Sequence, residues 1–236
     1  MPPFDLIALD ADDTLWHNET LYRASRNEFV RLLADVASED TIVNKLDQIE
    51  GRNLEPFGFG IKAYTLSLIE TAVELTDGQV SGRTVAQIVQ LAHEMVDAPV
   101  ELLDGVAETL PVLAEHNQLM LLTKGDLLDQ ERKLRRSGLA QYFSAVEIVS
   151  NKNTSGYAAV LQRHNLSAAR FMMVGNSLRS DVVPVLELGG SGVFIPFEIT
   201  WLHESAETPS ADRAGFYELK TFSELPNLIE KLNHQA

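Results

Sequence analysis

The sequence contains no cysteine among its 236 residues. A disulfide scaffold, a cysteine-ligated zinc or iron–sulfur site and catalysis by a thiol are therefore excluded. Long hydrophobic runs are missing as well, since none approaches the roughly 18 residues of a membrane span. The apolar stretch near the N-terminus lacks a preceding basic segment and lies between Asp5 and Asp10, so it predicts a first strand rather than a signal peptide. These features favour a cytoplasmic protein.

Positive charge is scarce in this chain. The 19 lysines and arginines are outnumbered by 34 aspartates and glutamates, which gives a formal net charge of −15 at pH 7. A surface of this sign repels nucleic acids and anionic lipids, so neither is an expected partner. An anionic substrate would need a local reversal of the field, which a bound metal ion can supply. The apolar content of 45% is ordinary for a globular protein that buries its own core.

Short apolar runs that end in polar residues recur along the chain and predict parallel strands covered by helices on both faces. Amphipathic helical patterns lie between the later runs. This alternation predicts an α/β fold, a doubly wound parallel sheet with a Rossmann-like core and right-handed crossovers. The expected strands are residues 4–9, 119–122, 171–174 and 193–195, with a weaker one at 145–149, and the expected helices are residues 105–116, 127–137 and 154–164.

The interval from residue 16 to residue 99 interrupts this alternation. It carries three amphipathic helical patterns and no convincing strand, and the third opens with a predicted capping box of Thr84 and Gln87. A helical excursion that only enlarges the core would explain these patterns. Their length and their position after the first strand instead favour a separate domain. We therefore expect an α/β catalytic core of residues 1–15 and 100–236 and an inserted α-helical cap of residues 16–99.

Polar side chains follow the predicted strands at the points where the chain leaves the sheet. Because open parallel sheets bind ligands outside the carboxyl ends of their strands, these side chains should converge. Crowded carboxylates need a cation, and oxygen ligands without histidine or cysteine select a hard ion, of which Mg²⁺ is the expected one. The set comprises Asp10, Asp12, Asp13 and Thr14 after the first strand, Thr123 and Lys124 after the second, Asn176, Ser177 and Asp181 after the third, and Lys152 before the helix that leads into the third.

This set of side chains is suited to phosphoryl chemistry. A carboxylate beside such an ion can attack phosphorus and form an aspartyl-phosphate. A second carboxylate two residues further on can protonate the leaving group and then deprotonate the water that clears the intermediate. Charge on the phosphoryl oxygens needs hydrogen-bond donors, and Thr123, Lys152 and the backbone N–H groups after Asp10 are placed to supply them.

Four segments together resemble the motifs of the haloacid dehalogenase superfamily. Residues 10–15, Asp-Ala-Asp-Asp-Thr-Leu, resemble its first motif, and residues 121–123 its second. Lys152 resembles its third, and residues 175–181, Gly-Asn-Ser-Leu-Arg-Ser-Asp, its fourth. The resemblance spans residues 3–15 and 100–225, and the interval between them is similar to the helical cap of the phosphatase branch. Four motifs in order are far more specific than Asp-x-Asp-x-Thr alone.

The resemblance implies roles for individual residues. Asp10 would be the nucleophile and a metal ligand. Asp12 would be the general acid/base and would bind the metal through its backbone carbonyl. Thr123 and Lys152 would hold the phosphoryl oxygens, and Asp181 would complete the Mg²⁺ site.

One position departs from the family pattern. The fourth motif usually begins Gly-Asp, whereas here it begins Gly175-Asn176. An amide oxygen can still ligate Mg²⁺ or hold a bound water, but it gives up a negative charge. We therefore expect Asn176 to take part in the metal site with weaker affinity. The same departure leaves open a non-catalytic protein that binds a phosphorylated ligand.

The expected function is a Mg²⁺-dependent phosphatase of small phosphorylated metabolites, with nucleotide and sugar phosphates both open as substrates. A dehalogenase would share the fold, but it needs no acid for a halide leaving group, so Asp12 disfavours it. A phosphonate hydrolase would want a Schiff-base lysine, and neither Lys45 nor Lys62 has a context that singles it out. A phosphoryl mutase runs the same first half-reaction and stays open as an alternative.

Three further residues are not expected to take part in catalysis or substrate binding. Asp13 is expected at the surface or facing the cap rather than in catalysis. Trp16 and Trp201 are expected to pack in the core or the cap rather than to contact substrate.

Overall fold

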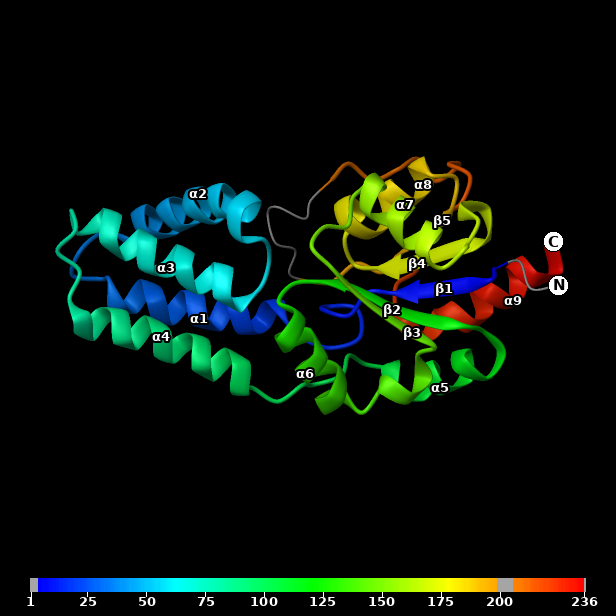
Figure 1. Cartoon of the computed structure of the whole chain (residues 1–236), viewed down its shortest axis with the longest axis horizontal. Coiled ribbons are helices and arrows are strands. Elements are labelled where there is room, and N and C mark those ends of the chain that lie inside the picture. Colours follow the sequence, from blue (N-terminus) through cyan, green and yellow to red (C-terminus); the bar gives the residue numbers. More distant parts are fainter. Residues whose placement is uncertain (1–3, 199–205, 236) are drawn as a thin grey trace. The chain divides into compact units, whose positions relative to one another are not determined.

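Six strands form one parallel sheet in the order β3-β2-β1-β4-β5-β6 (Figure 1) in the computed structural model, which describes residues 4–198 and 206–235. They are β1 (Leu6–Leu9), β2 (Leu119–Lys124), β3 (Ala145–Val149), β4 (Phe171–Gly175), β5 (Ser191–Phe194) and β6 (Phe216–Glu218). The α/β fold and the five expected strands are confirmed, and β6 is a further strand that the sequence pattern did not predict. Trp201 lies outside the described residues.

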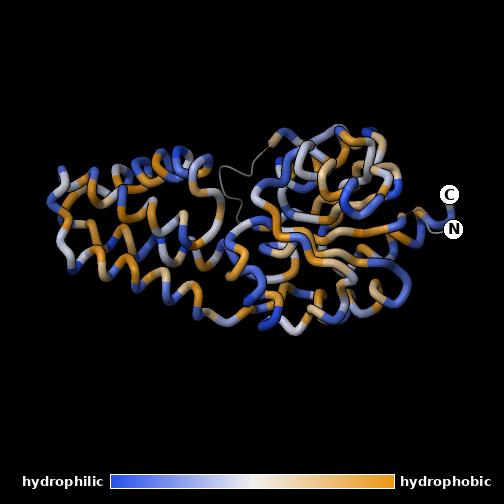
Figure 2. Tube along the Cα trace, in the orientation of Figure 1, coloured by the Kyte–Doolittle hydropathy of each residue, from blue (hydrophilic) through white to orange (hydrophobic). Residues whose placement is uncertain are grey.

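Helices cover both faces of the sheet. On β1, Ile7 and Leu9 pack into one hydrophobic cluster, whereas Leu6 and Ala8 pack into another, because successive side chains of a strand point to opposite faces. The first cluster includes residues of α5 (Val106–His116), α6 (Leu127–Ser137) and α9 (Leu225–Gln235), and the second includes residues of α7 (Thr154–Arg163) and α8 (Val183–Glu187). Hydrophobic residues accordingly run along the strands (Figure 2). Burial on both faces explains why these strands read as nearly continuous apolar runs.

The order of the strands reverses at β1, whose neighbours are β2 on one side and β4 on the other. Leu9, the last residue of β1, is level with Leu121 and with Val174. The N–H of Asp10 donates to the Val174 carbonyl over 2.9 Å. Ligands of open α/β sheets bind at such a reversal, outside the carboxyl ends of the strands. The loops after β1 and β4 leave from this place and carry most of the first and fourth motifs, and the second motif, residues 121–123, lies in β2 just before its end.

The chain divides into two compact units. One contains the sheet and consists of Met1–Glu19, Val100–Lys124 and Gln130–Ala236, and the other consists of Thr20–Pro99 and Gly125–Asp129. The second unit, here the helical unit, contains α1 (Glu19–Leu32), α2 (Glu39–Phe57), α3 (Ile61–Leu75) and α4 (Gly82–Asp97). It has a hydrophobic core of its own, which includes Phe29, Leu46, Leu68 and Ile88. None of the described helices is both long and apolar enough to cross a membrane.

The helical unit holds one helix more than the three that the sequence predicted. α2 was missed although it has a clear start signal, because the Ser38 side chain caps it by accepting from the Thr41 N–H. Ile42, Leu46 and Ile49 are buried along its length with helical spacing. Polar residues of the exposed face stand between these three residues in the sequence, and they obscure the helical period of the buried ones.

α4 begins earlier than predicted. Ser81 is its N-cap, and the Ser81 hydroxyl accepts from the Thr84 N–H over 3.0 Å. The predicted capping box of Thr84 and Gln87 is therefore wrong, since Thr84 lies inside the first turn. The apolar pattern marks only the buried face of a helix, and the first turn of α4 is polar.

The two segments that lead out of the sheet unit and back into it are hydrogen-bonded to each other. They pair as an antiparallel bridge. The Leu103 N–H donates to the Leu15 carbonyl over 3.0 Å, and the His17 N–H donates to the Glu101 carbonyl over 2.9 Å. The helical unit is thus inserted between two neighbouring backbone segments.

Candidate active site

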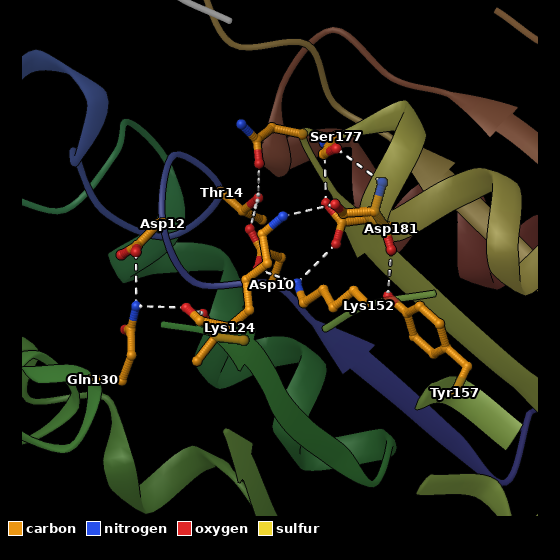
Figure 3. A network of polar contacts seen from close by, with 12 residues as sticks. Asp10, Asp12, Thr14, Lys124, Gln130, Lys152, Tyr157, Ser177 and Asp181 are labelled. Atoms are coloured by element: carbon orange, nitrogen blue, oxygen red, sulfur yellow. Dashed lines mark hydrogen bonds and ion pairs between the residues drawn. The ribbon is translucent and has the colours of Figure 1, made fainter. Parts of the chain in front are cut away.

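Asp10 lies at the carboxyl end of β1, where only 7% of the residue is exposed. The Lys152 ammonium group contacts Asp10 Oδ1 and donates to Asp181 Oδ1 over 2.8 Å, so it bridges two carboxylates from distant parts of the sequence (Figure 3). The Thr14 hydroxyl donates to Asp10 Oδ2 over 3.3 Å. The structure therefore brings together the residues expected as nucleophile, phosphate-binding lysine and distal carboxylate.

The charged groups of this cluster, together with their burial, shift one another's pKa values. Burial raises the pKa of Asp10 to about 7, Lys152 opposes that rise, and the carboxylate of Asp181 adds to it. Burial alone would lower the pKa of Lys152, but Asp10 and Asp181 outweigh it and hold that pKa above its ordinary value. Lys152 is thus a permanent positive charge between two acids. Strongly shifted pKa values of this kind are typical of functional sites.

Asp181 lies in the π-helix Leu178–Val182 and is 1% exposed. Its Oδ2 accepts from the Ser177 N–H over 3.0 Å, while its Oδ1 faces Lys152. Gly175 makes room for this carboxylate, because a β-carbon at that position would lie 2.2 Å from Asp181 Oδ2. The glycine that opens the fourth motif is therefore required by the close approach of the Asp181 side chain. Short π-helical segments of this type are frequent at functional sites.

Asn176 faces the oxygen atoms that a metal ion would need. Its amide lies 3.3 Å from Asp10 Oδ2 and 3.2 Å from the Asp12 carbonyl oxygen, and with its nitrogen toward them it donates to both. Turned over, the amide presents its oxygen at the same place, and neighbouring ligands of an octahedral Mg²⁺ lie about 3 Å apart. One carboxylate and two neutral oxygens thus fit Mg²⁺, which completes its shell with waters and substrate oxygens.

Acidic side chains alone do not make a metal site in the described part of the chain. Among these residues, no group of three aspartate, glutamate or histidine side chains is placed to hold an ion. The neutral oxygens of Asp12 and Asn176 are therefore essential to the fit. The role of Asp181 as a ligand stays a prediction, and its two oxygens accept from Lys152 and Ser177.

Thr123 and Lys124 end β2. Thr123 is 1% exposed, and its hydroxyl makes a long contact of 3.4 Å with the Lys124 carbonyl. Lys124 Nζ donates to Ser180 Oγ over 2.8 Å, which places a second ammonium group beside the loop after β4. The Tyr157 hydroxyl donates to the Ser180 carbonyl over 3.0 Å and fixes that residue from α7 (Figure 3).

The Asp12 carboxylate lies apart from Lys152 and points toward Gln130 (Figure 3). Trp16 Nε1 donates to Asp12 Oδ1 over 2.7 Å, and Gln130 Nε2 donates to Oδ2 over 2.8 Å. Lys133 Nζ donates to both oxygens, at 2.7 and 2.9 Å. The Asp12 side chain is 22% exposed. The predicted acid/base is thus accessible and held by donors on α6.

Asp13 is buried, so it does not lie at the surface, and its carboxylate faces the start of α1, inside the interval expected to form the cap. It is 8% exposed and accepts from the N–H groups of Asn18 and Glu19, at 2.9 and 3.1 Å. Burial raises the pKa of Asp13 to about 7, and the Asn18 N–H opposes that rise. The expected surface position is wrong because the start of α1 offers N–H groups that have no partner within the helix, and the Asp13 carboxylate satisfies them.

Sequence reasoning missed the residues that hold Asp12. Trp16 was expected only to pack, and it does lie fully buried in the core of the sheet unit, but its indole also donates to Asp12. Gln130 and Lys133 are three residues apart on the helix that follows the second motif, so they share one helix face. That spacing was a usable signal, although it does not say which carboxylate the face meets.

The family model of haloacid dehalogenase-like hydrolases matches residues 4–185. The chain belongs to this family. A haloacid dehalogenase-like family hydrolase from Xanthomonas campestris has a crystal structure similar to this one, with 38% identity and a TM-score of 0.88, over 99% of this chain and 93% of the other. A search among curated proteins found no match. The resemblance inferred from the four motifs is confirmed.

Two more distant solved structures share the fold of this hydrolase. A 2-haloacid dehalogenase from Pseudomonas syringae pv. tomato DC3000 has 20% identity and a TM-score of 0.64, over 97% of this chain and 99% of the other. A hydrolase of the superfamily from Bacillus subtilis, described as bound to magnesium, has 16% identity and a TM-score of 0.64, over 96% of this chain and 98% of the other. At these identities the likeness shows the fold alone.

Proposed function

We propose that this hydrolase is a Mg²⁺-dependent phosphatase of small phosphorylated metabolites that works through an aspartyl-phosphate on Asp10. Asp12 is the observation that carries the proposal. A halide leaves without a proton, so a dehalogenase has no use for a second carboxylate two residues after the nucleophile. The alkoxide released from a phosphate ester does need an acid. Asp12 lies on the same loop as Asp10 and is partly exposed.

In the first half-reaction, an oxygen of Asp10 attacks phosphorus. The bond between phosphorus and the ester oxygen breaks, and Asp12 gives its proton to the departing oxygen. Lys152 and Thr14 contact the two oxygens of Asp10 and orient its carboxylate for this attack. The product is the aspartyl-phosphate on Asp10 and a free alcohol.

In the second half-reaction, Asp12 takes a proton from water while the water oxygen attacks the phosphorus of the aspartyl-phosphate. The bond between phosphorus and Asp10 breaks, and inorganic phosphate leaves. Asp10 returns as a carboxylate, and Asp12 regains the proton that it gave to the leaving group. Both half-reactions therefore need Asp12 in a defined position.

The phosphoryl oxygens need positive charge and hydrogen-bond donors in this acidic protein. Thr123 and Lys152 are the proposed donors, and Lys124 adds an ammonium group beside Ser180. The proposed holders of Mg²⁺ are Asp10, the Asp12 carbonyl, Asn176 and Asp181. The bound ion would offset the charge of the phosphoryl group in a chain whose net charge is −15.

We also propose that the inserted helices, expected over residues 16–99, act as a cap that selects the substrate. The rings of Tyr22 and Tyr64 lie edge to face with centroids 5.0 Å apart. Arg26 pairs with Asp47 at 2.9 Å and with Glu50 at 2.7 Å. These contacts stabilise the helical unit itself, and its closure would exclude water and contact the part of the substrate that does not react. The proposed substrate is a nucleotide phosphate or a sugar phosphate.

A second function, phospho-ligand binding without turnover, has one observation in its favour. Asn176 takes the place of a carboxylate that would strengthen the hold on Mg²⁺. A protein that kept the phosphate donors but bound the ion weakly would retain the ligand and lose turnover.

Release of inorganic phosphate from p-nitrophenyl phosphate tests the proposal. Wild type with Mg²⁺ should turn over, and Asp10→Asn should lose at least about 10³-fold in kcat because the amide is not a nucleophile. Asp5→Asn is the matched control, since Asp5 is 45% exposed and pairs with Arg170. That variant should keep full activity.

The other outcomes of this assay separate the alternatives. Equal inertness of wild type and Asp10→Asn over a series of divalent metals would favour the binding function. Full activity of Asp10→Asn would exclude Asp10 as nucleophile. Release of chloride from 2-chloropropionate without release of phosphate would identify a dehalogenase.

A further inference from the structure

The Asp12 carboxylate accepts hydrogen bonds from three side chains, and two of them come from α6. Lys133 Nζ reaches both oxygens, and Gln130 Nε2 reaches Oδ2. Gln130 is 3% exposed, and the Lys133 side chain is 14% exposed. Two polar side chains this deeply placed are costly unless their hydrogen bonds are specific. Both of them end on the one carboxylate that the proposed reaction uses twice.

The donors on α6 are themselves fixed in position. Gln130 Nε2 also donates to the Lys124 carbonyl over 3.1 Å, at the end of β2. Lys133 Nζ also donates to Asn18 Oδ1 over 3.0 Å. Leu134 of the same helix is buried in the core of the sheet unit. α6 therefore presents a preorganised pair of donors rather than two mobile side chains.

Gln130 has a further property that suits this place. Its Oε1 is buried and has no hydrogen-bond partner in the described part of the structure. A side-chain amide carries a donor at one end and an acceptor at the other. In the observed orientation Nε2 donates both to the Asp12 carboxylate and to the Lys124 carbonyl, so the donor end of the amide is held toward Asp12. Turning the amide over would place Oε1 against the Lys124 carbonyl oxygen, so Gln130 holds the carboxylate form of Asp12.

We propose that Lys133 and Gln130 are positioning residues for Asp12, which hold its carboxyl group where the leaving oxygen and the attacking water must meet it. The proposal rests on the phosphatase function and deepens it. The two residues touch neither phosphorus nor the ester, and they act through Asp12. Their loss should therefore slow the steps that need Asp12 and spare the step that does not.

The steps can be told apart by the leaving group. p-Nitrophenolate is a weak base that departs with little help from an acid, whereas phenolate is a stronger base that needs more. For Lys133→Met, kcat/KM for p-nitrophenyl phosphate should stay within about threefold of wild type, and kcat/KM for phenyl phosphate should fall about 10²-fold, as expected for lost general acid catalysis. kcat should fall for both substrates because hydrolysis of the aspartyl-phosphate needs Asp12 as a base. A burst of p-nitrophenolate should precede the slow steady state.

Three variants control this experiment. Lys133→Arg keeps a cation and several N–H donors, so it should recover part of the lost activity. Lys231→Met makes the same change at an exposed position of α9 and should behave as wild type. On an Asp12→Asn background, Lys133→Met should have no further effect, since a residue that acts only through Asp12 is silent without it.

A spectroscopic readout does not depend on turnover. The chain has two tryptophans, and the indole N–H of Trp16 donates to Asp12. Its NMR signal, identified by Trp16→Phe, should shift in Lys133→Met and in Gln130→Met as the carboxylate moves.

The outcomes are distinct. Equal losses for both aryl phosphates, an additive loss on the Asp12→Asn background or an unmoved Trp16 signal would overturn the positioning role. An increase in rate for Lys133→Met would overturn it as well, because the contacts would then hold Asp12 back. Inert wild type would instead reject the phosphatase function itself.

Discussion

Asn176 lies 3.3 Å from Asp10 Oδ2, where one charge more or less would set the affinity for the proposed Mg²⁺. Asn176→Asp should lower the Mg²⁺ concentration for half-maximal activity about tenfold, because the charge of the ligands sets the affinity for a hard ion. Without Mg²⁺, the same variant should melt at a lower temperature than wild type, because two carboxylates then repel each other. Titration of activity with Mg²⁺ and melting with and without the ion measure both effects.

The exposed Asn165 provides the control for this substitution. Asn165→Asp adds the same charge at an exposed position outside the candidate site and should leave the Mg²⁺ dependence unchanged. An unchanged Mg²⁺ requirement in Asn176→Asp would show that residue 176 does not touch the ion.

Among single residues, the polar residues that follow the strands were predictable, whereas the side chains of α6 that hold Asp12 were not. Asp10 and Asp181 come together because both follow parallel strands that end at one edge of the sheet, and this rule needs no side-chain detail. The choice between Lys152 and Lys133 as partner of a given carboxylate depends on distances of a few ångströms. Sequence spacing does not contain those distances. Lys133 was missed for this reason.

At the scale of elements, a buried glutamate of α2 pairs with an arginine of α1. Glu50 is 7% exposed and accepts from Arg26 over 2.7 Å. Burial raises the pKa of Glu50 to about 7, from 4.5, and Arg26 opposes that rise. The stability that comes from the neutral form is fully present below pH 4.5 and is lost as the pH rises through 7. The helical unit should therefore be weakened by this group at alkaline pH.

Glu50→Gln removes the titrating group and keeps an acceptor for Arg26. Its free energy of unfolding relative to wild type should rise with pH, by about 3 kcal/mol in total for a shift of this size. Urea unfolding at several pH values between 5 and 8 measures the difference. Glu28→Gln, at a side chain that is 51% exposed, is the matched control and should change the free energy of unfolding by less than about 0.5 kcal/mol. A flat difference for Glu50→Gln would mean that Glu50 stays ionised throughout.

The elements of the sheet unit were easier to predict than those of the helical unit. Strands buried on both faces have few polar interruptions, so their limits stand out in the sequence. α2 buries one face only, and its apolar residues are diluted by polar ones. β6 has three residues, Phe216–Glu218, which is too short for any period to show.

At the scale of the whole molecule, each unit has its own hydrophobic core, so damage to one should stay local. Leu46 is fully buried in the helical unit. Leu46→Ala should destabilise that unit by about 2–5 kcal/mol. Hydrogen exchange should then become faster for amides of α1 to α4 and stay unchanged for amides of β1, β2 and β4.

The reciprocal variant checks the independence of the two cores. Leu122→Ala makes the same change in a core of the sheet unit, where Leu122 is 1% exposed. It should speed up exchange in the strands and spare the helices. Equal loss of protection everywhere, from either variant, would show one cooperative unit instead of two.

The architecture of the sheet unit was predictable as a whole because few topologies satisfy alternating strands and helices with right-handed crossovers. The number of strands was not, since edge strands are short and contribute little to the pattern. The return of the chain beside its own exit, at residues 15–17 and 101–103, could not be predicted either. It depends on backbone hydrogen bonds, which every residue type except proline can form, so the side chains give no signal for it.

The backbone hydrogen bonds between residues 15–17 and residues 101–103 fix the distance between the two ends of the inserted segment. Because these two ends stay within hydrogen-bond distance, an insert of different length changes the entropy of loop closure only slightly. Trp16, whose indole donates to Asp12, lies in one of the two paired segments. The catalytic loop therefore keeps its shape when the insert is exchanged. If the helices select the substrate as proposed, exchange of the insert would change the substrate and leave the contacts of Asp12 in place.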